Sequence, residues 1–336
     1  MLATTTTQTA PGEPTQEAPG LDQLTALCKA SGDRLRLEVL QALRQDSLAV
    51  QELCAIFDIR QPAMSHHLKI LAASGLVTSR REGNSIYYRR TVLRQEPTLE
   101  TLQSSLFAAI DQIPMSASQQ AQLSSVQQAR QQSSQDFFQQ NADKFRAQQD
   151  LIASYDQYAE TVAQALADAP LNSRQQALEV GPGDGSFLSH LSPAFESVVA
   201  LDTAAEMLAR SQQLTRQQGL ENIEFVHGDT RHERLSRISA DCIVVNMVLH
   251  HTPSPADIFK DLSACLAPGG VLLITDLCQH DQDWAREACG DLWLGFDPKD
   301  LAGWAQRAGL KEIASEYLAQ RNGFQIQVRL FGHQSI

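Results

Sequence analysis

The feature that most constrains the fold is the glycine-rich segment LEVGPGDG at residues 178–185, which begins within a short apolar run. In this part of the chain, apolar runs alternate with helical segments; the runs are ALEV, SVVALD, IEFVHGD, DCIVVNMVL and GVLLITDL. Such an alternation predicts a parallel sheet covered on both faces. Two strand-like runs joined at Asn322-Gly323 predict a terminal antiparallel hairpin. We therefore expect a C-terminal α/β domain.

The same loop indicates a ligand site. A loop between a strand and a helix is a place where a phosphate or adenosyl ligand binds. Gly181, Gly183 and Gly185 lack a Cβ atom, which permits tight backbone angles and the close approach of a ligand. Asp202 ends the next predicted strand, in a position to accept from both hydroxyls of a ribose, and Asp229 follows the third, in a position to accept from an adenine amino group. Three landmarks in this order predict a nucleoside-binding edge.

The N-terminal part has the pattern of a helix-turn-helix followed by a wing. Apolar residues recur at helical spacing between residues 21 and 44, and VQELCAIF predicts a further short helix. Pro62 suits the first turn of the next helix, and Gly75 closes that helix. LVTSRREGNSIYYRR then alternates branched or aromatic residues with charged ones around Gly83-Asn84, which predicts a two-stranded hairpin. Together these elements predict a mainly α winged helix-turn-helix domain.

The distribution of charge favours a nucleic-acid module in this part of the chain. The formal net charge of −12 argues on its own against nucleic acid as a partner. Residues 21–95, however, hold eleven Lys and Arg against seven Asp and Glu, so the basic charge is gathered around the predicted helix-turn-helix. We expect that segment to bind DNA.

Residues 48–90 resemble the ArsR/SmtB-type winged-helix regulators, because SHHLKIL, GLV, a basic strand, a Gly-bearing turn and YY follow in that family's order. The resemblance implies a homodimer on a double-stranded DNA operator with an inverted repeat. On the helix that enters the major groove, the residues expected to face bases or phosphates are Gln61, Ser65, His66 and Lys69. On the wing, the residues expected to contact the DNA backbone are Arg80, Arg81, Arg89 and Arg90. The alternatives are that these arginines form a solvated face and that His67 is a packed side chain.

The metal sites common in that family are not reproduced. Their thiolate site has Cys-X-Cys where this chain has Ala49-Val50-Gln51, and their other site uses His on the dimer helix, whereas residues 91–130 contain no His. Cys28 and Cys54 are more simply small core residues than ligands. We therefore expect no metal effector. The six cysteines lack CxxC spacing, and we expect reduced thiols without disulfides.

Residues 137–336 resemble class I S-adenosylmethionine-dependent methyltransferases, including NMVLHH at 246–251 and LAPGGVLLI at 266–274. The resemblance implies a Rossmann-like fold with S-adenosylmethionine or S-adenosylhomocysteine as ligand. The ligand-binding residues it implies are Glu179 at the amino-acid end, Gly181, Gly183 and Gly185 beneath the ligand, Asp202 at the ribose, Asp229 and Thr230 at the adenine, and Asn246 after the fourth strand. The structural competitor is a nicotinamide dehydrogenase. The GxGxG loop that ends in Ser186, the Gly-Asp pair after the third strand and the terminal hairpin oppose it.

No residue is assigned a catalytic role. Methyl transfer from a sulfonium needs mainly the alignment of donor and acceptor, so the lack of a recognisable acid or base does not exclude it. His250 and His251 are either a base near neutral pH or capping and packing residues. Cys278 and Cys289 do not reproduce the spaced cysteine set of arsenite methyltransferases. The aromatic residues of the following insertion either form a lid over the ligand or cover the sheet; they are Trp284, Trp293 and Phe296.

These patterns divide the chain into four parts. The parts are a disordered tail at 1–20, the winged helix-turn-helix domain at 21–95, a dimerisation helix with a glutamine-rich connector at 96–136, and the methyltransferase-type domain at 137–336. The dimerisation helix is predicted from an apolar stripe with no obvious partner, namely Leu99, Leu102, Leu106, Ile110 and Ile113. The connector is either a polar helix or partly disordered. Without a membrane-length apolar segment or a secretory signal, we expect a cytoplasmic location.

Together these features predict a homodimeric DNA-binding regulator whose methyltransferase-type domain binds S-adenosylmethionine or S-adenosylhomocysteine as its effector. The chain resembles fusions of this kind among regulators of the methionine and S-adenosylmethionine cycle. The alternative is an active methyltransferase of a small molecule that uses its DNA-binding head for autoregulation.

Overall fold

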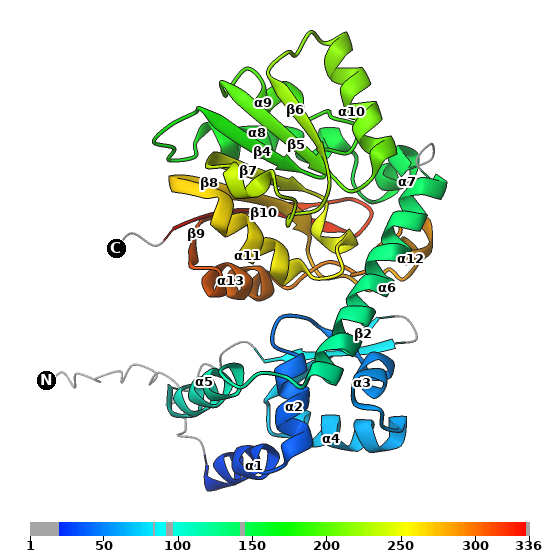
Figure 1. Ribbon diagram of the computed structural model, residues 1–336, viewed down its shortest axis with the longest axis vertical. Helices are drawn as coiled ribbons and strands as arrows, with labels where there is room; N and C mark the ends of the chain where they lie inside the picture. Colours follow the sequence, from blue (N-terminus) through cyan, green and yellow to red (C-terminus); the bar gives the residue numbers. More distant parts are fainter. Residues whose placement is uncertain (1–19, 83–84, 92–96, 142–144, 334–336) are drawn as a thin grey trace, which may run out of the picture.

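The computed structural model describes residues 20–82, 85–91, 97–141 and 145–333, which form two lobes joined by a long helix (Figure 1). The smaller lobe holds the N-terminal helices with a three-stranded sheet, and the larger lobe holds a seven-stranded sheet. All but the last residue of the predicted tail lies outside the described residues, as does the predicted turn Gly83-Asn84. Within the described ranges, no helix is both long and apolar enough to cross a bilayer.

The smaller lobe is a winged helix-turn-helix, as predicted. Its elements are α1 (Leu21–Ser31), α2 (Arg34–Ala42), β1 (Leu48–Ala49), α3 (Val50–Phe57), α4 (Gln61–Ala73), β2 (Val77–Glu82) and β3 (Ser85–Arg90). The three strands are antiparallel in the order β1-β3-β2. Asp33 caps α2, since its carboxylate accepts from the Arg36 amide at 3.0 Å. Pro62 lies in the first turn of α4, where the missing N–H has no helical partner to lose.

Helix α5 (Pro97–Asp111) folds back against α2 of the smaller lobe. The predicted apolar stripe is therefore divided. Leu99 and Ile110 are buried in the core of their own lobe and Leu106 packs against it, whereas Leu102 and Ile113 are exposed. The expectation that the stripe has no partner within its own domain is corrected by this packing. A dimer seam on the exposed residues stays a prediction.

Helix α6 (Ala117–Asn141) leaves the smaller lobe and runs along the side of the larger one (Figure 1). It is one continuous helix through the residues for which the sequence allowed either a polar helix or partial disorder. Helices α7 (Phe145–Ile152) and α8 (Tyr155–Ala167) follow. Helix α8 begins with a capping contact, in which the Ser154 amide donates to Gln157 Oε1 at 2.8 Å.

The larger lobe has a Rossmann-like α/β fold. Its strand order is β6-β5-β4-β7-β8-β10-β9, in which the first five strands are parallel and β10 runs antiparallel to both of its neighbours. The strands are β4 (Gln176–Val180), β5 (Ser197–Asp202), β6 (Ile223–His227), β7 (Ala240–Asn246), β8 (Leu266–Leu277), β9 (Leu310–Ala319) and β10 (Gln325–His333). The mostly parallel sheet and the final antiparallel pair confirm the predicted fold class.

Apolar cores lie on both faces of this sheet. Val199 and Val245 pack into one core with residues of α11, and Val198 and Val244 pack into the other with residues of α8, because successive side chains of a strand point to opposite faces. Burial on both faces explains the unbroken apolar runs of the sequence. The remaining elements are α9 (Leu188–Leu191), α10 (Ala205–Gln217), η1 (Leu235–Arg237), η2 (Leu249–His251), α11 (Pro255–Cys265), α12 (Trp284–Cys289) and α13 (Pro298–Arg307). The six cysteines are free thiols.

Candidate ligand cavity and DNA-reading surface

The loop after β4 depends on glycine for its shape. Gly181, Gly183 and Gly185 have φ angles of 66°, 59° and 87°, in the left-handed region that favours glycine. A Cβ atom on Gly181 would lie 2.5 Å from Val248 Cγ2, and one on Gly185 would lie 2.9 Å from Ser211 Cα. A Cβ atom on Gly183 would meet nothing within 4 Å. Gly183 therefore faces open space, whereas Gly185 allows α10 to pack closely on the loop.

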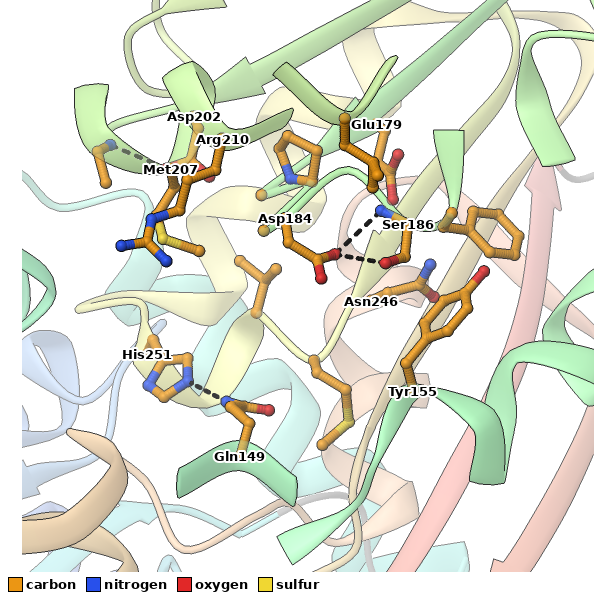
Figure 2. A pocket seen from close by; sticks show the side chains of 18 of the residues that line it. Gln149, Tyr155, Glu179, Asp184, Ser186, Asp202, Met207, Arg210, Asn246 and His251 are labelled. Carbon is orange, nitrogen blue, oxygen red and sulfur yellow. Dashed lines mark hydrogen bonds between the residues drawn. The ribbon is translucent and has the colours of Figure 1, made fainter. Parts of the chain in front are cut away.

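A cavity of about 440 Å³ opens where β4, β5 and β7 end (Figure 2). Ligands of open α/β sheets bind outside these carboxyl ends. The structure brings together five of the predicted ligand residues around this cavity, namely Glu179, Gly181, Gly183, Asp202 and Asn246. Gly185 is not one of its lining residues and packs against α10, and its predicted place beneath the ligand stays a prediction.

Glu179 and Asn246 present buried polar atoms to the cavity. No described residue meets hydrogen-bond geometry with Glu179 Oε2 or with either side-chain polar atom of Asn246, although Asn246 lies close enough to Glu179 to lower the pKa of that carboxyl. Burial, together with the nearby charge of Asp184, raises the pKa of Glu179 to about 8. Buried polar atoms without partners are costly, so this end of the cavity favours a ligand that supplies them. An ammonium group suits the carboxylate, and the carboxamide both donates and accepts.

Asp202 lies at the end of β5 and borders two cavities. It lines the cavity described above and also a second one of about 320 Å³. The Ala204 amide donates to its Oδ1 at 2.8 Å, which fixes the side chain. Burial raises the pKa of Asp202 to about 6. A fixed carboxylate between two cavities is suited to accept from the paired hydroxyls of a ribose.

The second cavity contains the residues predicted for adenine. Asp229 and Thr230 line it together with Asp202. Asp229 accepts from the Arg231 amide at 2.9 Å and pairs with the Arg231 guanidinium at 3.1 Å. Thr230 donates to Asp261 at 2.7 Å. The ribose and adenine residues expected from the sequence therefore lie around one cavity that adjoins the amino-acid end.

The two histidines after β7 have different environments. His250 is fully buried, and its Nδ1 lies 2.8 Å from Asp276 Oδ1. Burial lowers the pKa of His250, but the charges of Asp276 and Asp291 outweigh it and raise that pKa to about 9. His250 lines neither cavity, and Asp276 holds its Nδ1, which favours the packing role for His250. His251 lines the cavity and contacts Gln149 at 3.1 Å, and burial lowers its pKa well below the usual range (Figure 2).

His250, His251 and Asp291 form a compact cluster whose ligand atoms all lie within 4.8 Å of one another. Burial raises the pKa of Asp291 to about 7, and the charges of His250 and Arg286 oppose this rise. His250 of this cluster is already held by Asp276, and Arg286 lies close enough to Asp291 to affect the pKa of that carboxyl, so a metal ion would compete with contacts that the protein already makes. The absence of a metal effector stays a prediction.

Helix α4 presents the side chains predicted to read DNA. Four of them are exposed on one helix, namely Gln61, Ser65, His66 and Lys69. Arg81 is exposed on the neighbouring strand β2. His67 is partly buried, with its Nδ1 3.8 Å from Asp33 Oδ1, as in the packing alternative. Helix α4 and Arg81 together form the candidate DNA-reading surface.

Three wing arginines do not join that surface. Arg90 pairs with Asp111 at 2.7 Å inside the smaller lobe, while Arg89 pairs with Asp300 of the larger lobe. Arg80 donates to a backbone carbonyl of the larger lobe at 2.9 Å. The prediction treated the wing as one exposed face. Neighbouring residues of a strand, however, point to opposite sides, so these three arginines are divided between the smaller and the larger lobe. This placement corrects the expectation for Arg80, Arg89 and Arg90.

Strand β3 serves the cores of both lobes. Tyr88 packs against the core of the smaller lobe, and Tyr87 packs against that of the larger one, edge-to-face with Trp293 at 5.6 Å between ring centroids. Trp293 and Phe296 are each only 3% exposed. Trp293 and Phe296 therefore cover the sheet, which was one of the two alternatives for the aromatic insertion. Trp284, the third aromatic residue of that insertion, is 40% exposed.

Asp46 is a residue of the joint between the lobes that sequence reasoning missed. It is 5% exposed and accepts from Ser254 Oγ at 2.6 Å and from Gln127 Nε2 at 2.8 Å. Burial raises the pKa of Asp46 to about 6. Its partners lie 81 and 208 positions away along the chain, so no local pattern points to the contact.

Arg130 of α6 is the second such residue. It pairs with Glu52 of α3 at 2.6 Å, and its guanidinium lies 4.7 Å from the ring centroid of Trp293. It also donates to the Pro253 carbonyl at 3.3 Å. One arginine therefore holds the helix-turn-helix, the connector and the larger lobe together. Arg130 lies in a glutamine-rich stretch with weak hydrophobic periodicity, so no sequence pattern marks it as a contact residue.

Two family models match the chain. One described as a methyltransferase domain matches residues 152–326, and one described as bacterial regulatory protein, arsR family, matches residues 33–79. The chain is 31% identical over 153 residues to malonyl-[acyl-carrier protein] O-methyltransferase of Marinomonas sp. (strain MWYL1), covering 44% of this chain and 54% of that protein. It is 37% identical over 81 residues to the HTH-type transcriptional repressor SmtB of Mycobacterium tuberculosis, covering 24% of this chain and 58% of that protein.

A solved structure of the N-methyltransferase NodS of Bradyrhizobium japonicum WM9, in complex with S-adenosyl-L-homocysteine, aligns with 57% of this chain and 98% of its own. The two share 17% identity with a TM-score of 0.44. The chain spans little more than half the length of the two curated relatives named above.

Proposed function

Because this chain belongs to the methyltransferase-domain family and carries an ArsR-family DNA-binding region, we propose that it is a transcriptional regulator with a nucleoside effector. Its helix-turn-helix binds a specific operator, and its methyltransferase-type domain binds S-adenosylmethionine or S-adenosylhomocysteine. The observation that carries the proposal is segment 252–254, which borders the second cavity and also contacts the DNA-binding lobe.

The residues of the cavities fit such a ligand. Glu179 and Asn246 offer unpartnered atoms to the ammonium and carboxylate of its amino-acid end, and Asp202 accepts from the ribose hydroxyls. The open cradle at Gly183 leaves room for the ligand beside the loop. When bound, S-adenosylmethionine would supply an electrophilic methyl group, whereas S-adenosylhomocysteine would not. The residues named here bind either compound.

Segment 252–254 provides the link to DNA. Ser254 donates to Asp46, the Pro253 carbonyl accepts from Arg130, and the Thr252 carbonyl accepts from Trp293 at 2.7 Å. A ligand that fits one position of this segment better than another shifts the position of the DNA-binding lobe. A coupling free energy of about 1–3 kcal/mol changes operator affinity by roughly 5–150-fold.

The test is operator affinity with and without the ligand. Operator duplexes selected from a random pool should bind the full chain with a dissociation constant that changes at least about fivefold at saturating S-adenosylhomocysteine. Asp202→Asn should abolish this response while it leaves ligand-free DNA binding intact, and Asp156→Asn, at an exposed position of α8, should retain it. An affinity that stays constant across saturating concentrations of both adenosyl compounds would end the proposal.

We also propose that the regulator binds an inverted repeat as a homodimer, with α4 of each protomer in a major groove. The exposed Leu102 and Ile113 favour a further apolar contact outside a single chain. Sedimentation of the full chain should give twice the monomer mass, and the selected operators should show two-fold symmetry. A monomer on an asymmetric site would contradict both statements.

One feature favours the alternative of an active enzyme. The first cavity continues past Asn246 to Tyr155, Tyr158 and Met247, which leaves space for an acceptor next to the ligand. Burial raises the pKa of both tyrosines, so each remains a neutral hydroxyl that can orient an acceptor. Incubation with methyl-labelled S-adenosylmethionine and a metabolite extract should then transfer label to a small molecule. If no label is transferred while S-adenosylhomocysteine binds tightly, the sensor alone remains.

A further inference from the structure

Helix α6 is unusual in composition for a connector. Ten of its 25 residues are glutamine, and it has few apolar positions. In Figure 1 it begins at the smaller lobe and continues beside the larger one, so its two sides face different surroundings along its length. A helix this polar is either a solvated spacer or a surface for a polar ligand.

One side of α6 belongs to the DNA-binding lobe. Leu123 and Val126 pack against the core of that lobe, and Arg130 pairs with Glu52. Another side lines the second cavity, and its residues follow the helical spacing of three, four, seven and ten positions; they are Ser124, Gln127, Gln128, Gln131 and Ser134. Gln128 and Gln132 are both exposed, but Gln132 and its partner Asp136 line neither cavity.

The cavity that these glutamines line also holds four carboxylates. Asp202, Asp229, Asp257 and Asp261 line the same cavity. Ionised carboxylates accept hydrogen bonds and cannot donate them. Adenine presents a donor at its 6-amino group and acceptors at its ring nitrogens, so carboxylates alone satisfy only half of its edge. Donors of this cavity include the guanidinium of Arg231, which pairs with Asp229, and the hydroxyl of Thr230, which donates to Asp261. A glutamine carboxamide offers a donor and an acceptor in one group, and it can bind adenine through both at once.

We propose that Gln128 and Gln131 of α6 form the base-recognition wall of the site and select an adenine nucleoside. This inference rests on the proposed function and adds residues from outside the methyltransferase-type sheet to the ligand site. The neighbouring Gln127 already donates to Asp46 at 2.8 Å. The helix that touches the base is therefore the helix that is anchored to the DNA-binding lobe, which makes occupancy of the site and the position of that lobe one event.

The experiment is calorimetric titration of the full chain with S-adenosylhomocysteine. The double variant Gln128→Ala/Gln131→Ala should bind about tenfold more weakly, since it loses two neutral hydrogen bonds. Gln132→Ala, on the same helix but outside the lining of both cavities, should bind like the wild type. Alanine has a higher helix propensity than glutamine, so both proteins should keep the helix, and circular dichroism checks this.

An analogue of S-adenosylhomocysteine with carbon in place of the adenine N7 acceptor provides a second readout. The wild type should bind this analogue more weakly than S-adenosylhomocysteine, and the double variant should lose most of that difference. If the wild type binds S-adenosylhomocysteine and the double variant binds it equally tightly, the role of α6 is overturned and the proposed function stands. If the wild type takes up neither S-adenosylmethionine nor S-adenosylhomocysteine, the proposed function itself fails.

Discussion

Glu179 is the residue whose surroundings say most about its ligand. Its side chain is 1% exposed beside Asp184, and its pKa of about 8 means that it is largely protonated near neutral pH when no cation is present. A ligand ammonium would favour the ionised form and release the proton. The same carboxyl therefore weakens the folded state at alkaline pH and recognises the ligand when it is bound.

Glu179→Gln should flatten the pH dependence of the free energy of unfolding. The folded pKa of about 8 lies above the ordinary value of 4.5, so this contribution is full below 4.5 and is lost as pH rises through 8. The wild type should lose stability relative to the variant over that interval by on the order of a few kcal/mol. Urea unfolding at both ends of the interval measures this, with the exposed Glu160→Gln as control. Parallel pH curves for the wild type and Glu179→Gln would contradict it.

Residues at strand ends were the part of the site that the sequence could predict. Asp202 was predicted from its position at the end of an apolar run, whereas Glu179 and Asn246 were implied by the resemblance to class I methyltransferases, and the structure brings all three to one cavity. Asp46 and Arg130 could not be found this way, because their contacts join segments about 80 or more positions apart. Hydrophobic periodicity carries no information about such pairs.

At the scale of elements, the wing shows how a strand divides its residues between two neighbours. Strand β3 was predicted correctly from its alternating pattern, yet the same alternation sends Arg89 and Arg90 to opposite lobes. The sequence gives the period of a strand but not what covers each side. Helix α6 was harder to predict, because a helix that lines a polar cavity lacks the apolar stripe by which helices are recognised.

Arg90→Ala and Lys69→Ala should separate stability from DNA binding. Arg90 is 10% exposed and pairs with Asp111, so its removal leaves a largely buried carboxylate and should lower the free energy of unfolding by about 2–3 kcal/mol. Lys69 is exposed on α4, so its removal should change stability by less than about 0.5 kcal/mol but weaken operator binding and reduce its salt dependence. Urea denaturation and binding at two salt concentrations measure both effects. Equal stabilities for the two variants would show that the Arg90 pair contributes little.

At the scale of the whole molecule, the joint between the lobes is polar and buried rather than a flexible linker. Asp46, Arg130 and segment 252–254 hold it from both sides. Buried hydrogen bonds to charged groups depend strongly on geometry, so a joint of this kind has few low-energy arrangements. A regulator needs a joint with few arrangements if a ligand bound in a distant cavity is to change the position of α4 relative to DNA.

Arg130→Ala should uncouple the two activities. Loss of its contacts with Glu52 and Pro253 loosens the joint without touching the glycine loop or α4. The variant should therefore bind S-adenosylhomocysteine and operator DNA separately, while the effect of one on the other falls to less than about twofold. Arg216→Ala, at an exposed position of α10, is the control and should keep the wild-type response. A full response in the Arg130 variant would place the coupling elsewhere.

Strand β3 has a consequence for anyone who wishes to build chimeras from this protein. Tyr88 belongs to one hydrophobic core and its neighbour Tyr87 to another. A DNA-binding domain transplanted from a free-standing repressor would keep the side of its wing that packs on its own helices, but the other side of its wing would carry residues suited to water. Such a chimera would fold, but its DNA-binding domain would not pack against the larger lobe. Restoring the aromatic and basic side chains at alternate positions of the wing would be the smallest change that restores the contact.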